Sequence, residues 1–147
     1  MRYVYWEDVI RFGFAELSRR EQLEFWADAA ERMTDVLEKN RGEDGKLGEA
    51  GMIALTEIDD LLTTYTIRTV EMKAGEDWES ISTGRQVDID GMEYGLAMPL
   101  TRDLLLDLPG SVYDALLTEA AVVNEALRQR FLAGADSPKN SKTTSEE

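Results

Sequence analysis

The side chains in this sequence that could do chemistry are carboxylates. Glu57, Asp59 and Asp60 lie within one helical turn of each other, and Asp88 and Asp90 follow further along the chain. Carboxylate oxygens are the ligands that divalent cations such as Ca²⁺ and Mg²⁺ prefer, so these five residues could serve a metal-dependent enzyme. Acidic residues on a helix without ligands from a neighbouring loop are more typical of a solvated surface, and we favour that interpretation.

Asp88, Asp90 and Gly91 partly match the start of a calcium-binding loop. Such a loop needs more oxygen ligands before its Gly and a bidentate Glu at its last position, where this chain has Pro99. An Asp-Gly pair is also typical of a tight turn between two strands. We therefore predict a turn at Asp90-Gly91, within a small hairpin or extended ribbon over residues 86–94.

The composition lacks two of the side chains that enzymes use most often. The chain of 147 residues contains neither His nor Cys. His is the usual acid–base group near neutral pH and the commonest zinc ligand, and Cys would be needed for thiolate chemistry or disulfides. The sequence has no Ser nucleophile with an activating base and no dinucleotide-binding glycine pattern. We predict a non-enzymatic protein with no catalytic residues, no metal site and no cofactor.

The charge balance points to the kind of partner. Thirty Asp and Glu residues stand against 16 Lys and Arg residues, giving a net charge of −14. Such a charge repels nucleic acid and anionic membranes and favours basic partners. No apolar run approaches the roughly 18 residues of a membrane-spanning helix, and the N-terminus lacks the apolar core of a signal peptide. We expect a soluble protein that stays where it is made and binds neither nucleic acid nor membrane.

The clearest element signal predicts a helix over residues 18–40. Ser18 and Glu21 have the spacing of a capping box, in which each side chain bonds the backbone amide of the other residue. Apolar residues then recur at spacings of three and four, which predicts one buried stripe. The stripe consists of Leu23, Trp26, Ala30, Met33 and Leu37.

Further helices are predicted over residues 49–66, 101–106 and 110–132 by the same periodicity. Residues 2–16 are rich in aromatic and β-branched side chains and should form an N-terminal β arm, as a short hairpin or as one strand. Residues 65–73 leave helix and strand open, and we favour a helix that weakens near Thr66. The expected fold class is therefore α+β and mainly helical, with three longer helices, one short helix and one or two small β ribbons.

The chain organisation expected from these patterns is simple. Residues 1–133 should form a single globular domain, and residues 134–147 should be a disordered polar tail because they have no apolar side chains to bury. Residues 76–109 have the character of a spacer between two helical parts. We expect Trp78 to be the buried packing anchor between those parts.

Two segments of the chain carry a resemblance to a known family. The first segment is Phe14-Ala15-Glu16-Leu17-Ser18-Arg19-Arg20-Glu21 with Phe25. The second is Asp77-Trp78-Glu79-Ser80-Ile81, Asp90-Gly91, Pro99-Leu100-Thr101 with Leu104-Leu105, and Leu108-Pro109-Gly110. The two segments resemble the tail assembly chaperones of long-tailed (siphovirus-type) bacteriophages. The first is similar to the strand, Leu-Ser/Thr pair and charged helix entry of such proteins, and the second to their order of Asp-Trp turn, Asp-Gly turn, Thr-capped helix and final helix.

This resemblance implies a non-enzymatic role in virion assembly. A protein of this kind coats the hydrophobic, helical tape-measure protein and recruits major tail-tube protein subunits in the cytoplasm of the infected bacterial host. Self-association into a homo-oligomer is an open possibility.

A different class of protein also stays open, namely an acidic inhibitor or nucleic-acid mimic that binds a basic partner. The Asp and Glu residues are spread over every segment, which is less typical of a mimic with one acidic face.

Overall fold

The computed structural model describes residues 1–39, 47–81, 84–127 and 129. The predicted polar tail, 134–147, and the end of the predicted last helix lie outside this part of the chain. The elements run in the order β1 (Arg2–Trp6), β2 (Ile10–Phe14), α1 (Arg19–Lys39), α2 (Leu47–Thr66), β3 (Ile67–Ala74), β4 (Asp77–Ser80), β5 (Arg85–Ile89), β6 (Met92–Leu96), α3 (Arg102–Leu106) and α4 (Gly110–Val123).

The expectation of a mainly helical fold is wrong. The structure is mixed α/β, with 51% helix, 29% strand and about three substantial helices. The strands form two antiparallel sheets, one with the order β1-β2-β3-β4 and one made of β5 and β6. The larger sheet joins the N-terminal hairpin to residues 67–80, which are distant in sequence. A strand is stabilised by the neighbour that it pairs with, and a local sequence pattern does not reveal a distant neighbour.

The change from helix to strand occurs between Thr66 and Ile67, without a connecting loop. The hydroxyl of Thr66 donates to the carbonyl oxygen of Leu62 at 2.6 Å, and the Thr66 carbonyl accepts a bond from the Ala15 amide at 3.2 Å. From Ile67 onward the chain pairs with β2, with Val70 opposite Phe12. The predicted second helix, 49–66, ends at the expected residue. Residues 67–73, which the sequence left open with a weakening helix favoured, are strand because β2 provides the partner that the β-branched side chains need.

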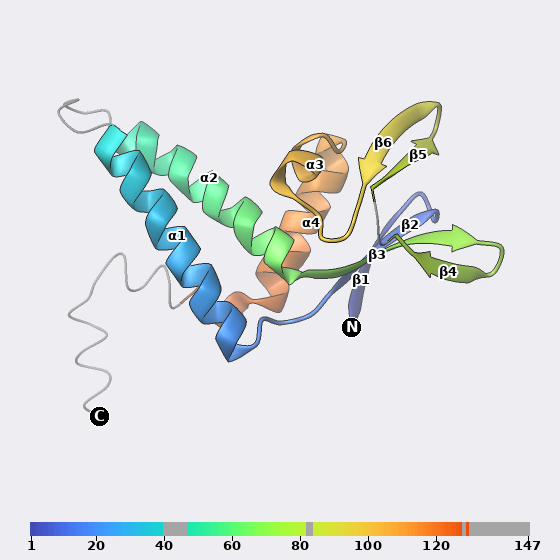
Figure 1. Ribbon diagram of the computed structural model, residues 1–147, viewed down its shortest axis with the longest axis horizontal. Helices are drawn as coiled ribbons and strands as arrows, with labels where there is room; N and C mark the ends of the chain where they lie inside the picture. The colour runs from blue at the N-terminus through green and yellow to red at the C-terminus, as the bar shows by residue number, and fades with distance from the viewer. Residues whose placement is uncertain (40–46, 82–83, 128, 130–147) are drawn as a thin grey trace.

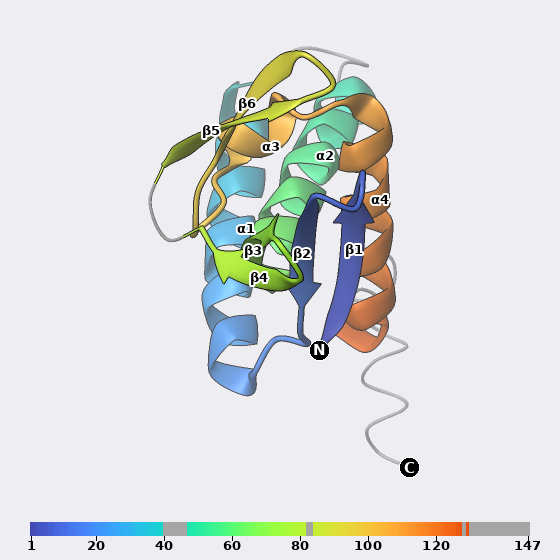
Figure 2. The same cartoon turned by 90° about the vertical axis from the view of Figure 1, so that its right-hand side faces the viewer.

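The four-stranded sheet buries one of its two faces. Glu7 and Asp8 both have positive φ angles, 54° and 57°, and turn β1 back into β2. Along β2, Ile10, Phe12 and Phe14 are fully buried in the main core. In Figure 2 the sheet lies in front of the helices, with α4 behind β1.

The predicted hairpin at residues 86–94 is confirmed as β5 and β6. Asp90 and Gly91 form the turn with φ angles of 55° and 84°, and the Asp88 carboxylate accepts a bond from the Gly91 amide at 3.1 Å. Val87 and Ile89 extend the main core from this ribbon. Residues 76–109 are thus not a spacer, since they supply β4, β5, β6 and α3.

Helices α1 and α2 form an antiparallel hairpin that extends away from the sheets (Figure 1). The capping box is confirmed: the Ser18 amide donates to Glu21 at 2.8 Å and the Glu21 amide donates to the Ser18 hydroxyl at 3.2 Å. The buried face of α1, however, contains Gln22, Phe25 and Ala29. Leu23 is 51% exposed, so the predicted stripe is rotated relative to the face that packs on α2.

The predicted last helix, 110–132, is interrupted at Asn124: α4 ends at Val123, and residues 125–127 and 129 are helical again. Asn124 has a non-helical backbone conformation (φ −113°, ψ 32°), and its side chain is buried. The Asn124 amide nitrogen donates to the Thr66 hydroxyl at 2.8 Å, and its oxygen accepts from the Leu17 amide at 3.2 Å. One polar side chain therefore joins the end of α4 to the end of α2 and the start of α1.

Candidate functional site

The carboxylates of α2 are partly structural. Asp60 is fully buried and accepts a bond from the Arg102 Nε at 2.8 Å and another from the Tyr113 hydroxyl. The Glu57 carboxylate lies 4.0 Å from the Arg102 guanidinium. Burial, together with the bond to Asp60, raises the pKa of Tyr113 to about 12, and the same carboxylate raises the pKa of Arg102. This cluster holds α3 and α4 against α2.

The structure does not assemble a metal site from the five candidate carboxylates. Asp88 and Asp90 belong to the β5–β6 ribbon, whereas Glu57, Asp59 and Asp60 lie on α2. Over the described residues, no group of three or more acidic side chains could hold a metal ion. The metal-dependent enzyme considered from the sequence therefore finds no support in this geometry.

A groove of about 230 Å³ lies between α2 and α4. Sites for small molecules usually have volumes of about 300–1,000 Å³, so this groove suits side chains of a partner better than a metabolite. Its lining combines apolar and polar side chains. The apolar ones are Leu62, Leu117, Ala120 and Ala121, and the polar ones are Asp59, Thr63 and Thr118.

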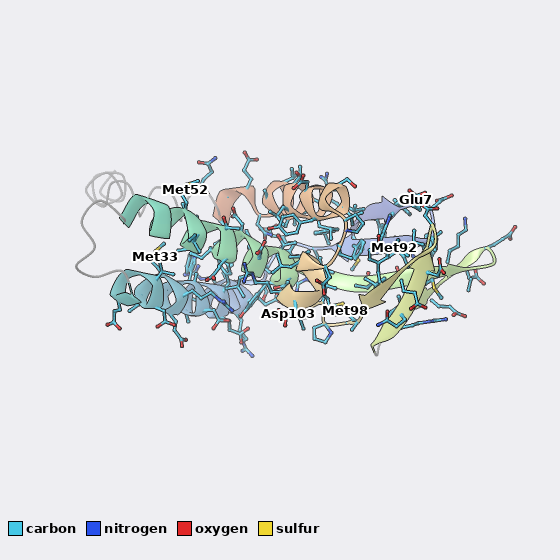
Figure 3. All side chains as sticks on the ribbon, turned by 90° about the horizontal axis from the view of Figure 1, so that it is seen from above. Glu7, Met33, Met52, Met92, Met98 and Asp103 are labelled. Carbon is cyan, nitrogen blue, oxygen red and sulfur yellow. The ribbon has the colours of Figure 1, made fainter. Side chains whose placement is uncertain are left out.

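Apolar side chains continue along α2 beyond the residues that line the groove. Met52 and Leu55 precede Asp59 by seven and four positions, which places all three on the same side of the helix. Met52 is 67% exposed and Leu55 is 40% exposed. Figure 3 places Met52 near the free end of the α1–α2 hairpin. We call this set of residues, Met52, Leu55, Leu62, Leu117 and Ala121, the groove surface.

Acidic side chains border the groove surface. Asp59 lies at its α2 side, and Asp114 lies on the side of α4 that carries Leu117 and Ala121, by its spacing of three and seven positions from them. An apolar strip flanked by carboxylates is complementary to an amphipathic helix with basic residues beside its apolar stripe.

The sequence did not identify the groove surface, although it contained one signal. Periodicity in the second predicted helix places Ala54, Ile58, Leu61, Leu62 and Tyr65 on one face. Ile58 and Leu62 are buried in the structure, whereas Met52 and Leu55 lie outside this set. Large apolar residues that do not fit the buried stripe of a helix are candidates for an exposed contact surface. Leu117 and Ala121 had no such signal, because only the packing of α4 on α2 brings them beside Leu62.

Trp78 does not lie between helical parts, so the expected buried anchor is wrong. It stands on β4, on the side of the large sheet that faces away from the core, where its ring is 5.8 Å from the Tyr5 ring. The Arg11 guanidinium lies over the Trp78 ring, 4.7 Å from its centroid. Trp78 is half-buried by these neighbours.

Comparisons with known proteins add no relative to these observations. A scan against protein-family models, a search of curated proteins and a search of solved structures each returned no match. Separately, no helix in the described part of the chain is both long enough and apolar enough to cross a membrane. The features that bear on the function of this protein are therefore the groove surface and the two sequence segments described above.

Proposed function

We propose that this protein is a non-enzymatic assembly chaperone that holds an amphipathic helix of its partner on the groove surface. The observation that carries the proposal is the exposed apolar side of α2, where Met52 and Leu55 lead directly into the groove. Adjacent exposed apolar side chains mark interaction surfaces, and an amphipathic helix is the usual occupant of such a groove.

The resemblance to phage tail assembly chaperones supplies the identity of the proposed partner. The tape-measure protein is a long helical chain with apolar side chains. These side chains would be exposed to water until the tail tube surrounds them, unless another protein binds them first. Asp59 and Asp114 would select segments that carry Lys or Arg beside their apolar stripe. In this proposal the protein also recruits the major tail-tube protein in the infected bacterial cytoplasm and is absent from the finished particle.

The test is co-purification of the full chain with the tape-measure protein and the tube protein encoded beside it. Leu55→Glu should weaken capture of the tape-measure protein by about tenfold or more, because it places a charge in an apolar contact. Leu23→Glu is the matched control, since Leu23 is also exposed, at 51%, but lies on α1. This control should bind like the wild type.

Two outcomes would count against the proposal. Failure to recover either phage protein with the wild-type chain would contradict the chaperone role. Capture of a basic protein that is lost in high salt and unaffected by Leu55→Glu would favour the acidic inhibitor instead, because screening removes charge attraction and leaves apolar contacts intact.

A further inference from the structure

The outer side of the four-stranded sheet, which faces away from the helices, is an uncovered surface. No described helix lies in front of β1 and β2 in Figure 2. In the register of the sheet, Tyr5 is opposite Arg11 and Lys73 is opposite Trp78. We call the set Tyr3, Tyr5, Arg11, Lys73 and Trp78 the aromatic face.

The side chains of the aromatic face are held in fixed positions before any partner arrives. The Arg11 guanidinium carbon lies 4.3 Å from the Tyr3 ring centroid and 4.7 Å from that of Trp78. Its Nε donates to the Glu71 carboxylate at 2.7 Å. Tyr3 and Tyr5 nevertheless remain 36% and 54% exposed. Rigid, partly exposed rings contribute contact area at a low cost in conformational entropy.

The aromatic face also differs in charge from the rest of the molecule. It has two cations, Arg11 and Lys73, beside the single carboxylate of Glu71, on a chain whose net charge is −14. Two copies of a strongly acidic chain repel each other least where each presents a surface that is not acidic. A nucleic acid, in contrast, would be repelled by the chain as a whole and would meet few cations here.

We propose that a second copy of this chain packs on the aromatic face, so that two four-stranded sheets stack about a twofold axis. A twofold contact joins the same patch of both copies, so rings meet rings and no other surface is required. Sheets stacked in this way lie about 10 Å apart with interdigitated side chains.

The size of the sheet sets the strength of this dimer. Strands about 17 Å long and about 4.8 Å apart give a patch of roughly 300 Å² in projection for four strands. A standard interface buries about 800 Å² on each partner. We therefore expect a weak dimer and look for it at micromolar to millimolar concentrations of the chain.

The test is sedimentation velocity of the full chain across that concentration range, at low and at high salt. The wild type should pass from monomer to dimer, and salt should strengthen association because it screens the repulsion between the two acidic copies. Tyr5→Glu should weaken association by about tenfold or more. Leu106→Glu, at a 48% exposed site on α3, makes the same charge change away from the face and should dimerise like the wild type.

Thermal unfolding of both variants checks that each is folded, and if Tyr5→Glu unfolds, Lys73→Glu provides the test at an exposed site of the same face. A wild type that stays monomeric, or equal effects of Tyr5→Glu and Leu106→Glu, would overturn the proposal. A monomeric chain whose aromatic face binds a labelled single-stranded oligonucleotide would reassign the face to nucleic acid. None of these readouts depends on the groove surface, so this inference and the proposed function can fail separately.

Discussion

At the scale of single residues, Asp60 was a candidate metal ligand in the sequence, but in the structure its carboxylate joins three helices. Its two oxygens are taken by Arg102 and Tyr113, which come from α3 and α4. The sequence placed Asp60 on an exposed acidic side of its helix, whereas the structure buries it completely. The two bonding partners lie 42 and 53 positions further along the chain, so no local pattern reveals them.

Arg102→Met should destabilise the protein by about 3 kcal/mol, because it leaves the Asp60 carboxylate buried without its cation. The value is at the lower end for a buried pair, since the Arg102 side chain is 37% exposed. The double variant Arg102→Met/Asp60→Leu should recover much of the loss. Urea unfolding measures both, with Arg85→Met as the exposed control. A neutral Arg102→Met would show that water satisfies Asp60.

Glu21 is a residue whose pH dependence can be predicted. Its bonds to Arg68 first, and then to the Ser18 amide, lower the pKa of the carboxyl from 4.5 to about 2. A carboxyl whose pKa is lower in the folded state stabilises the protein above pH 4.5, and this stabilisation is lost as the pH falls from 4.5 toward 2.

Glu21→Gln should therefore be less stable than the wild type at pH 7, and the difference should shrink below pH 4.5. The measurement is the free energy of unfolding in urea across this pH range. Glu31→Gln, at an exposed position of the same helix, is the control and should show no such convergence. A difference that is constant with pH would mean that Glu21 acts through its capping geometry alone.

At the scale of elements, the alternation of strands decides which aromatic residues are structural. Trp6 points into the core, is 7% exposed and has its ring 4.9 Å from the Tyr94 ring. Trp78 stands on the opposite side of the sheet. From the sequence we expected Trp78 to be buried, but one face of a sheet can be buried while the other remains open.

Trp6→Ala should cost about 3–5 kcal/mol of folding stability because it removes a buried ring from the core. Trp78→Ala should cost only about 1–2 kcal/mol, since its ring is half-buried among Tyr5, Arg11 and Lys73. Chemical unfolding of the two variants gives the comparison directly. Equal losses would indicate that the outer side of the sheet is covered as tightly as the inner side.

In the helices, local sequence predicts the ends of an element better than the side that it buries. The capping box located the start of α1 within one residue, because the two bonds involved are local. The buried side of α1 was predicted less well, since Leu23 and Ala30 fit the apolar stripe but are exposed. Packing on α2 selects Phe25 and Ala29 instead, and Leu23 is left outside.

At the scale of the whole molecule, the fold has two uncovered surfaces on different elements. The groove surface lies between α2 and α4, and the aromatic face lies on the outer side of the large sheet (Figures 1 and 2). One is bordered by carboxylates and the other carries cations among aromatic rings. The partner contact and the dimer contact that we propose therefore use different surfaces of the chain.

The sequence by itself determined the local features of this protein: the capped starts of α1 and α3, the Asp90-Gly91 hairpin and the acidic charge. Each depends on residues that are close together in the chain. Only the tertiary structure decided that residues 67–80 are strands, that Asp60 is buried and that Met52 and Leu55 lead into a groove. Those outcomes depend on pairing and packing between distant segments, whose free energy no local pattern contains.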